Sequence, residues 1–392
     1  MQYRTLGRSN RRVSILGFGC MRLPILKDAG NATNFFERQM AIDEEKALEM
    51  IDYAIEQGIN YFDSAYLYHG GKSEVVLGKA MKNRREKVIL ATKSPLRMIE
   101  TRDDFDRIMD EQLERLGTDY LDFYMLHGVN RQAWYKGKEL GVLDFLDTIK
   151  KDGRAKYVGF SFHDDVRIFK EIIEAYDWTI CQIQYNFFDE HYQAGKEGLR
   201  YAASKGIGMV IMEPLRGGRL TEKIPEEVQR IWDSTKQGWS PAEWGLRWVW
   251  NHPEVSVVLS GMSTIAQLKE NIRIAKKVTP NSMSPEETEI ISKVAAAYRQ
   301  VLKLDCTGCA YCMPCPYEVN IPVIFSLYND YFMFKDLNIC RIMYNVLMAP
   351  EQIASNCVEC GECEEKCPQK IEIMETLKEA HDLFYHEGMA GH

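Results

Sequence analysis

The feature that most constrains the fold is a regular alternation between residues 13 and 260. Short β-branched or apolar runs are followed by longer amphipathic stretches, the order that repeated strand–helix units produce. With runs at 15–19 and 255–260 included, the pattern predicts an α/β fold, a closed (β/α)8 barrel of the TIM type. Six other runs end at intervals of 30, 34, 34, 21 and 30 residues, about one unit each: Asp63, Lys93, His127, Ser161, Gln182 and Met212.

The sequence pattern of alternating strands and helices ends near residue 280. Upstream, amphipathic helices are predicted at 43–57 and 103–116, each followed by a glycine. Downstream, Ser284 precedes Pro and Glu, which predicts a helix running to about residue 304. We therefore expect a barrel domain over 1–280, followed over 281–392 by a linker helix and a small, mostly helical domain.

Composition excludes several classes of function. The chain has 392 residues, 49 Lys and Arg against 57 Asp and Glu, and a formal charge of −8. Because no basic block is present, a nucleic-acid partner is not expected. The N-terminal residues lack a signal-peptide pattern, and no apolar stretch reaches about 18 residues. We expect a cytoplasmic globular protein without a membrane partner.

Polar residues end three consecutive predicted strands at Asp63, Lys93 and His127, and Tyr68 lies in the loop after Asp63. In a β/α barrel these ends surround one mouth, so the four side chains can meet. They suit carbonyl reduction: Tyr68 donates a proton, Lys93 lowers its pKa, Asp63 holds Lys93, and His127 orients the substrate oxygen. The alternative is a helix cap, a solvated lysine, a packed tyrosine and a core histidine, with Tyr66 as a rival phenol.

These residues lie in motifs that resemble the aldo-keto reductase family, over about residues 1–275. The motifs are FDSAYLY at 62–68 with SE at 73–74, ATK at 91–93, and DYLDFYMLH at 119–127. The resemblance implies that the four residues form the family's catalytic tetrad and selects Tyr68 over Tyr66. It also implies a nicotinamide cofactor, NADH or NADPH, and a small aldehyde or ketone substrate.

The resemblance further implies where the cofactor lies, across the barrel mouth. The glycines near residue 217, flanked by Arg216 and Arg219, would let backbone amides and a cation approach the pyrophosphate; a plain glycine turn is the alternative. The implied cofactor contacts are Gly19, Met21, Arg22, Ser161, Gln182, Met212, Leu215, Gly217, Gly218, Glu270 and Asn271.

The chain departs from the family pattern around this cofactor. Ser161 is followed by Phe-His where an asparagine is usual, and Met212 stands where many members stack an aromatic ring. Gly261 and Gln267 stand where members that prefer NADPH place Lys and Arg. Because a ribose 2′-phosphate normally needs such cations, we predict no strong preference for NADPH.

Eight of the eleven cysteines form two tight clusters, which indicates metal binding in a reducing compartment. Residues 357–368 read C-x2-C-x2-C-x3-C-P, as in bacterial ferredoxins, and residues 306–316 are one residue shorter before the fourth cysteine. Zinc is the alternative metal. The other three are Cys20, Cys181 and Cys340, of which the first two are predicted to be buried thiols.

Resemblance to two-cluster ferredoxins implies two [4Fe-4S] centres with crossed ligands, and the roughly 40-residue helical insert between the runs resembles the helical ferredoxin type. One centre would use three cysteines of the first run and the last of the second. The other would use three of the second and the last of the first. The two ligand sets are Cys306, Cys309, Cys312 and Cys367, and Cys357, Cys360, Cys363 and Cys315.

The fusion of these two parts leaves three functions open. Clusters transfer single electrons, whereas nicotinamide transfers a hydride, so a direct path between them faces a mismatch. The chain is therefore predicted to be an NAD(P)H-dependent carbonyl reductase whose clusters are structural or dock a redox partner protein. The alternatives are a ferredoxin-linked oxidoreductase that uses a flavin or other mediator, and a redox sensor that binds nicotinamide without appreciable turnover.

Overall fold

The computed structural model describes residues 1–26 and 40–389, and its contacts divide the chain into two compact units. The first unit comprises residues 1–217 and 239–285, and the second comprises 218–238 and 286–392. The chain therefore passes between the units three times. The division into a barrel domain over 1–280 and a smaller domain over 281–392 stays a prediction.

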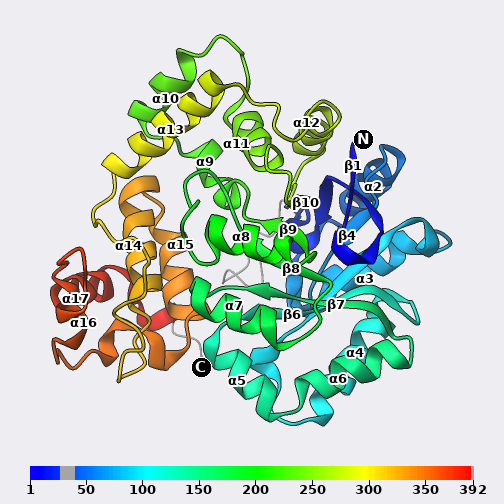
Figure 1. The fold of residues 1–392 in the computed structure, drawn as a ribbon, viewed down its shortest axis with the longest axis horizontal. Helices are drawn as coiled ribbons and strands as arrows, with labels where there is room; N and C mark the ends of the chain where they lie inside the picture. Colours follow the sequence, from blue (N-terminus) through cyan, green and yellow to red (C-terminus); the bar gives the residue numbers. More distant parts are fainter. Residues whose placement is uncertain (27–39, 390–392) are drawn as a thin grey trace. The chain divides into compact units, whose positions relative to one another are not determined.

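The first unit contains a closed barrel of eight parallel strands, which confirms the predicted fold (Figure 1). The strands follow one another around the barrel in chain order, and β10 closes it by pairing with both β9 and β3. The strands are β3 (Leu16–Gly19), β4 (Tyr61–Asp63), β5 (Ile89–Ser94), β6 (Leu121–Val129), β7 (Ala155–Phe162), β8 (Ile180–Gln184), β9 (Gly208–Met212) and β10 (Val255–Ser260).

An N-terminal hairpin, not predicted from the sequence, covers the amino ends of the strands. Its strands β1 (Tyr3–Thr5) and β2 (Arg12–Ser14) pair antiparallel. Leu6, fully buried, joins the apolar cluster inside the barrel, and Arg8 N donates to Gly206 O, just before β9. The carboxyl ends of the strands, at the other end of the barrel, therefore hold the candidate site.

Helices surround the barrel in the first unit (Figure 1). The helices predicted at 43–57 and 103–116 form as α2 and α4. Gly117 ends α4 with a φ of 61°, a conformation that costs glycine little. The helices are α2 (Glu44–Glu56), α3 (Lys72–Met81), α4 (Asp103–Leu116), α5 (Arg131–Glu139), α6 (Val142–Lys151), α7 (Val166–Ala175), α8 (Gly195–Ser204), α11 (Pro241–Trp250) and α12 (Ile265–Ala275).

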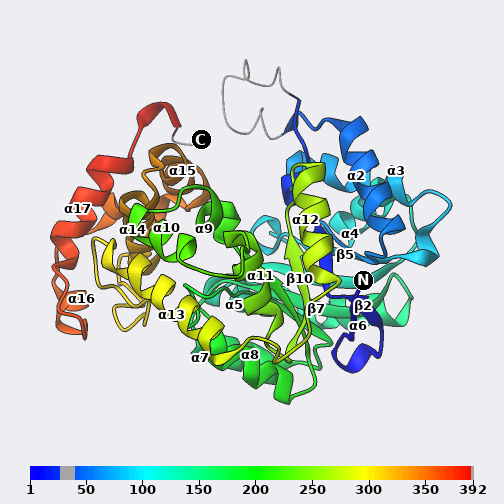
Figure 2. The same cartoon turned by 90° about the horizontal axis from the view of Figure 1, so that it is seen from above.

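The second unit is mostly helical. Its apolar core is built around α14, α15 and α17, and these helices gather together in Figure 2. No helix within residues 1–26 and 40–389 is long and apolar enough to cross a membrane. The helices are α9 (Arg219–Glu222), α10 (Glu226–Asp233), α13 (Pro285–Gln300), α14 (Ile321–Phe334), α15 (Leu337–Ile342), α16 (Glu362–Glu365) and α17 (Ile373–Phe384).

Candidate active site and cysteine cavities

The structure brings Asp63, Tyr68, Lys93 and His127 together at the carboxyl ends of β4, β5 and β6. The fully buried Lys93 forms an ion pair with Asp63 and donates to the backbone oxygen of Ser64 over 2.8 Å. The ring centroid of Tyr68 lies 5.1 Å from Nζ of Lys93. The rings of Tyr68 and His127 lie 5.6 Å apart at 83°, edge to face.

The surroundings set the protonation states of these groups. Burial raises the pKa of Tyr68, and the charge of Lys93 opposes that rise. Burial alone would lower the pKa of Lys93, but Asp63 and Tyr68 outweigh it and the pKa rises. Burial and then the charge of Lys93 lower the pKa of His127 well below its usual range. At neutral pH the site holds a protonated phenol, a cationic lysine and a neutral imidazole.

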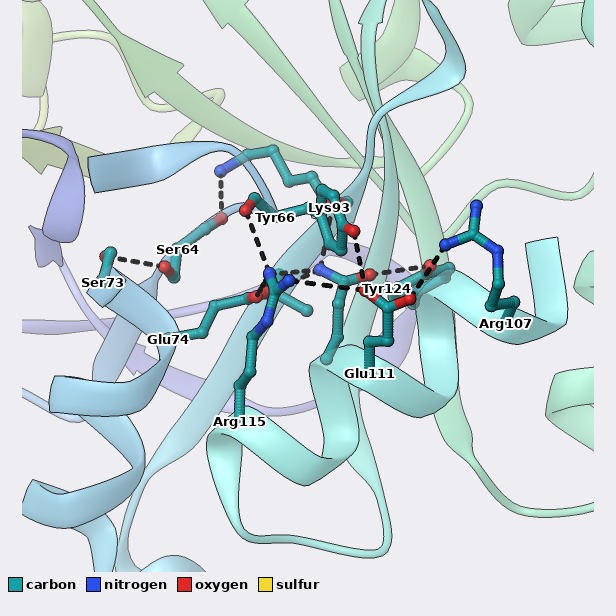
Figure 3. Close-up of polar contacts among 11 residues, drawn as sticks. Ser64, Tyr66, Ser73, Glu74, Lys93, Arg107, Glu111, Arg115 and Tyr124 are labelled. Carbon is teal, nitrogen blue, oxygen red and sulfur yellow. Dashed lines mark hydrogen bonds and ion pairs between the residues drawn. The ribbon is translucent and has the colours of Figure 1, made fainter. Parts of the chain in front are cut away.

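The rival phenol, Tyr66, has other partners (Figure 3). Its hydroxyl donates to Glu111 of α4 over 2.7 Å, and the guanidinium of Arg115 lies 4.3 Å from its ring centroid. Tyr68, not Tyr66, is therefore the phenol beside Lys93.

A buried polar network supports the strand that carries Lys93 (Figure 3). Glu74, which is fully buried, accepts hydrogen bonds of 2.6 Å from both Thr92 and Gln112. Gln112 also donates to the backbone oxygen of Lys93 over 3.2 Å and accepts from the Tyr124 hydroxyl over 2.9 Å. These bonds fix β5 against α3 and α4, and so fix the position of the lysine.

This network was not predicted from the sequence. Glu74 lies in the motifs that resemble the family, but no role was assigned to it. Gln112 offered a signal of its own, because it shares the buried face of α4 with Phe105, Ile108 and Met109. A polar side chain on an apolar helical face needs buried partners, and here they lie beside Lys93.

Three predicted cofactor residues lie at the ends of neighbouring strands. Ser161 is buried on β7, and its hydroxyl accepts from the Gly128 amide over 2.8 Å. Gln182 on β8 lies beside Met212, with 3.5 Å between Nε2 and Sδ. Its buried Oε1 has no hydrogen-bond partner within the described residues. An unsatisfied buried acceptor is costly, so this oxygen fits the amide donor of a nicotinamide carboxamide.

A second group of predicted cofactor residues surrounds the turn after β9. Gly217 has a φ of +66°, and a Cβ there would lie 2.5 Å from Nη2 of Arg22. Arg22 also lies along Gly261, where a Cβ would approach its Cδ to 3.0 Å. The lack of side chains at both glycines thus makes room for one guanidinium, which suits a phosphate contact.

The two arginines beside this turn are engaged elsewhere. Arg216 lies 3.5 Å from the carboxylate of Asp189, between Nε and Oδ2. Arg219 forms an ion pair with Asp330 within the second unit. The sequence suggested these arginines as the cation beside the pyrophosphate, but the structure makes Arg22 the better placed candidate.

The remaining predicted cofactor residues have diverse surroundings. Gly19 ends β3 where a Cβ would come within 3.3 Å of the Ser260 oxygen, whereas the side chain of Met21 is exposed. Glu270 accepts from Ser240 over 2.6 Å, and Asn271 donates to Ser260 over 3.0 Å. The other two flank the turn after β9: Leu215, which contacts Gly245, and Gly218, whose φ is +91°.

The eight clustered cysteines surround two cavities in the second unit. One cavity is lined by the first three cysteines of the second run, by Cys315 and by Cys312. The other is lined by the first three cysteines of the first run and by Cys367. The predicted ligand sets therefore each line one cavity, with Cys312 shared. No three His, Cys, Asp or Glu side chains in residues 1–26 and 40–389 converge on a single-ion position.

The two cysteine runs have matching backbones despite their different lengths. The residue before each second cysteine is left-handed, with φ of +67° at Gly308 and +56° at Glu359. Three residues after each fourth cysteine, the amide bonds back to that cysteine's oxygen, over 3.0 Å from Glu318 and 3.2 Å from Lys370. The shorter first run thus forms the same kind of loop as the second.

Comparison with known protein families matches both parts of the chain. The family model for the aldo/keto reductase family matches residues 16–293, and the chain belongs to this family. A second model, for the 4Fe-4S dicluster domain, matches residues 305–372. The protein is therefore an oxidoreductase-type barrel fused to a ferredoxin-like iron–sulfur domain, as the sequence predicted.

Relatives match the barrel part of the chain. "Uncharacterized oxidoreductase YqkF" of Bacillus subtilis is 27% identical over 332 residues, covering 76% of this chain and all of that protein. L-galactose dehydrogenase of Arabidopsis thaliana is 26% identical over 338 residues, covering 78% and 96%. The solved structure of aldo-keto reductase AKR11C1 from Bacillus halodurans, holo form, has a TM-score of 0.62 at 29% identity, covering 76% and 97%.

Proposed function

We propose that this protein is an NAD(P)H-dependent reductase of small aldehydes or ketones whose C-terminal part holds two [4Fe-4S] clusters. The observation that carries the proposal is the buried Asp63–Lys93 pair, with the Tyr68 ring 5.1 Å from the Lys93 ammonium and His127 against the phenol ring. A buried cation next to a protonated phenol is suited to delivering a proton to a carbonyl oxygen.

In this mechanism a bound nicotinamide supplies the hydride that adds to the carbonyl carbon. The Tyr68 hydroxyl donates its proton to the carbonyl oxygen, and the charge of Lys93 stabilises the phenolate left behind. Asp63 keeps Lys93 charged and in place. His127, neutral because its pKa is lowered, donates a hydrogen bond that orients the oxygen. These roles are assigned by matching the family's motifs to these positions and to their geometry.

Several residues would hold the nicotinamide cofactor. Gln182 and Ser161 would contact the carboxamide, because the unsatisfied Oε1 of Gln182 needs a donor. Arg22 and the glycine turn at 217–218 would contact the phosphates. Because Gly261 and Gln267 offer no cation, we propose no strong preference for NADPH; a much lower KM for NADPH than for NADH would contradict this.

The two cysteine cavities support the count of two clusters, each held by three cysteines of one run and one of the other. We propose that the clusters are structural or dock a redox partner, because single electrons do not match hydride transfer. Metal-bound thiolates persist in reducing compartments, in keeping with a cytoplasmic location. A net charge of −8 speaks against a nucleic-acid partner.

An anaerobic absorption spectrum of the purified protein, with iron, zinc and flavin measured on the same sample, tests the proposal together with turnover assays. We expect about eight irons per chain, a broad band near about 400 nm and no flavin. We also expect oxidation of NADH or NADPH that depends on a small aldehyde or ketone. Bound flavin would favour the ferredoxin-linked alternative, and nicotinamide binding without turnover would favour the sensor.

A further inference from the structure

Residues 218–238 connect β9 to α11 of the barrel, yet they pack within the second unit. Their helices α9 and α10 bury Leu220, Val228 and Trp232. The segment starts at Gly218, the second glycine of the turn proposed to contact the cofactor phosphates. A connection that leaves the cofactor turn is therefore held by the iron–sulfur unit.

Three polar contacts hold the start of this segment. Arg219, which follows the turn directly, forms an ion pair with Asp330 of α14. Asp330 is only 4% exposed. The Tyr298 hydroxyl donates to the Leu220 oxygen over 3.3 Å. Lys223 and Asp336 form a more exposed pair of 2.7 Å. Because a buried ion pair is screened less by water than an exposed one, the Arg219–Asp330 pair is the strongest of these attachments.

The helix that carries Asp330 also holds the first cysteine run. The neighbouring residue, Asn329, accepts from the Leu304 amide over 2.8 Å and donates to the Leu304 oxygen over 3.0 Å. Leu304 lies two residues before Cys306. At the start of the same helix, Ile321 lines both cysteine cavities. One rigid helix thus contacts both cavities and the residue after the cofactor turn.

We propose that Asp330 is a positioning residue for the nicotinamide cofactor, which acts by holding Arg219 and thereby the turn at 217–218. The inference rests on the proposed function, because it takes this turn to be a cofactor contact. Both glycines have left-handed φ values, +66° and +91°, and glycine is the most flexible residue. Without the ion pair, the cost of ordering the turn would fall on cofactor binding.

Fluorescence titration of the iron-loaded full chain with NADH and with NADPH tests the proposal. We expect Asp330→Asn to weaken binding about tenfold, within the usual range of coupling between sites. Hydrogen exchange at residues 217–222 should become faster. The matched control is Asp336→Asn, which removes the exposed pair of the same segment and should leave the Kd nearly unchanged. Arg219→Lys, which keeps a positive charge opposite Asp330, should bind the cofactor with nearly the affinity of the parent chain.

An unchanged Kd in Asp330→Asn with full iron content would overturn the inference and leave the proposed function standing. A parent chain that binds neither nicotinamide would overturn both. If Asp330→Asn fails to load iron, the double variant Arg219→Gln/Asp330→Asn answers the same question, because it leaves no uncompensated buried charge. In that variant, parental affinity would again overturn the inference.

Discussion

Tyr68 and Tyr66 are two residues apart, and their contacts separate their roles: Tyr68 lies beside Lys93 and His127, and Tyr66 beside Glu111. Removing the hydroxyl of Tyr68 removes the proposed proton donor beside Lys93. We expect Tyr68→Phe to lower kcat for carbonyl reduction at least about 100-fold, the usual effect of losing a general acid. Steady-state kinetics with a fixed aldehyde measure it.

The matched control is Tyr66→Phe, which loses the 2.7 Å bond to Glu111. We expect kcat to stay near the parent value and the free energy of unfolding to fall by about 1–2 kcal/mol. A large loss of kcat in Tyr66→Phe, with Tyr68→Phe active, would reverse the assignment.

The pKa shifts at the site predict the pH profile of reduction. Because burial raises the pKa of Tyr68 above its usual value near 10, the phenol keeps its proton through the neutral range. Because burial and Lys93 lower the pKa of His127, the imidazole stays neutral there as well. We expect kcat/KM to be flat from about pH 6 to 9 and to fall at higher pH. An acid limb near the usual histidine pKa would contradict this.

The four tetrad positions could be predicted because each is fixed by a short local pattern, a strand end or the loop after it. The buried polar network that supports β5 could not. Gln112 and Tyr124 reach Glu74 and β5 from other elements, so their contacts depend on side-chain packing that no spacing along the chain encodes. The unsatisfied Oε1 of Gln182 could not be predicted either, because it depends on which groups pack around that side chain.

Among the elements, the N-terminal hairpin places Leu6 inside the amino end of the barrel, fully buried. We expect Leu6→Ala to lower the free energy of unfolding by about 2–5 kcal/mol through lost burial and the cavity left behind. Denaturant unfolding of the full chain measures it. Leu26→Ala is the control, since Leu26 is 49% exposed, and a comparable loss there would contradict the argument.

The cysteine runs predict crossed ligation. Cys315 belongs to the first run but lines the cavity of the second. We expect Cys315→Ser to lower the iron content from about eight to about four per chain and to disturb the second-run centre. Iron analysis and electron paramagnetic resonance measure both effects. Cys340→Ser should keep all the iron, because this buried thiol lies against the Leu327 oxygen instead.

All eight strands of the barrel could be predicted, because hydrophobic periodicity sets them. The hairpin could not, since strands of three residues with charged positions have too little pattern. The helix predicted to reach residue 304 ends at Gln300. Beyond that end, the amides of Lys303 and Leu304 donate to the side-chain oxygen of Asn329. This contact joins distant parts of the chain, so the local sequence does not encode it.

At the scale of the whole molecule, α14 links the cysteine cavities to the segment that follows the turn proposed to contact the cofactor. We expect anaerobic removal of iron with a chelator to raise the KM for NADH several-fold. The kcat at saturating cofactor should be kept, because the tetrad lies in the barrel. Steady-state kinetics of stripped and reconstituted chains measure the split. A lost kcat with unchanged KM would instead place the clusters on the path of the reaction.

The second unit is assembled from two separated stretches, 218–238 and 286–392. The first stretch therefore leaves the ribosome well before α14, which carries the partner of Arg219, exists. The last strand of the barrel and its flanking helices are made in between. Maturation thus has an order: Arg219, the residue after the turn, acquires its ion-pair partner only after synthesis reaches α14. A truncated messenger would yield a barrel whose strands are complete and whose turn has no anchor.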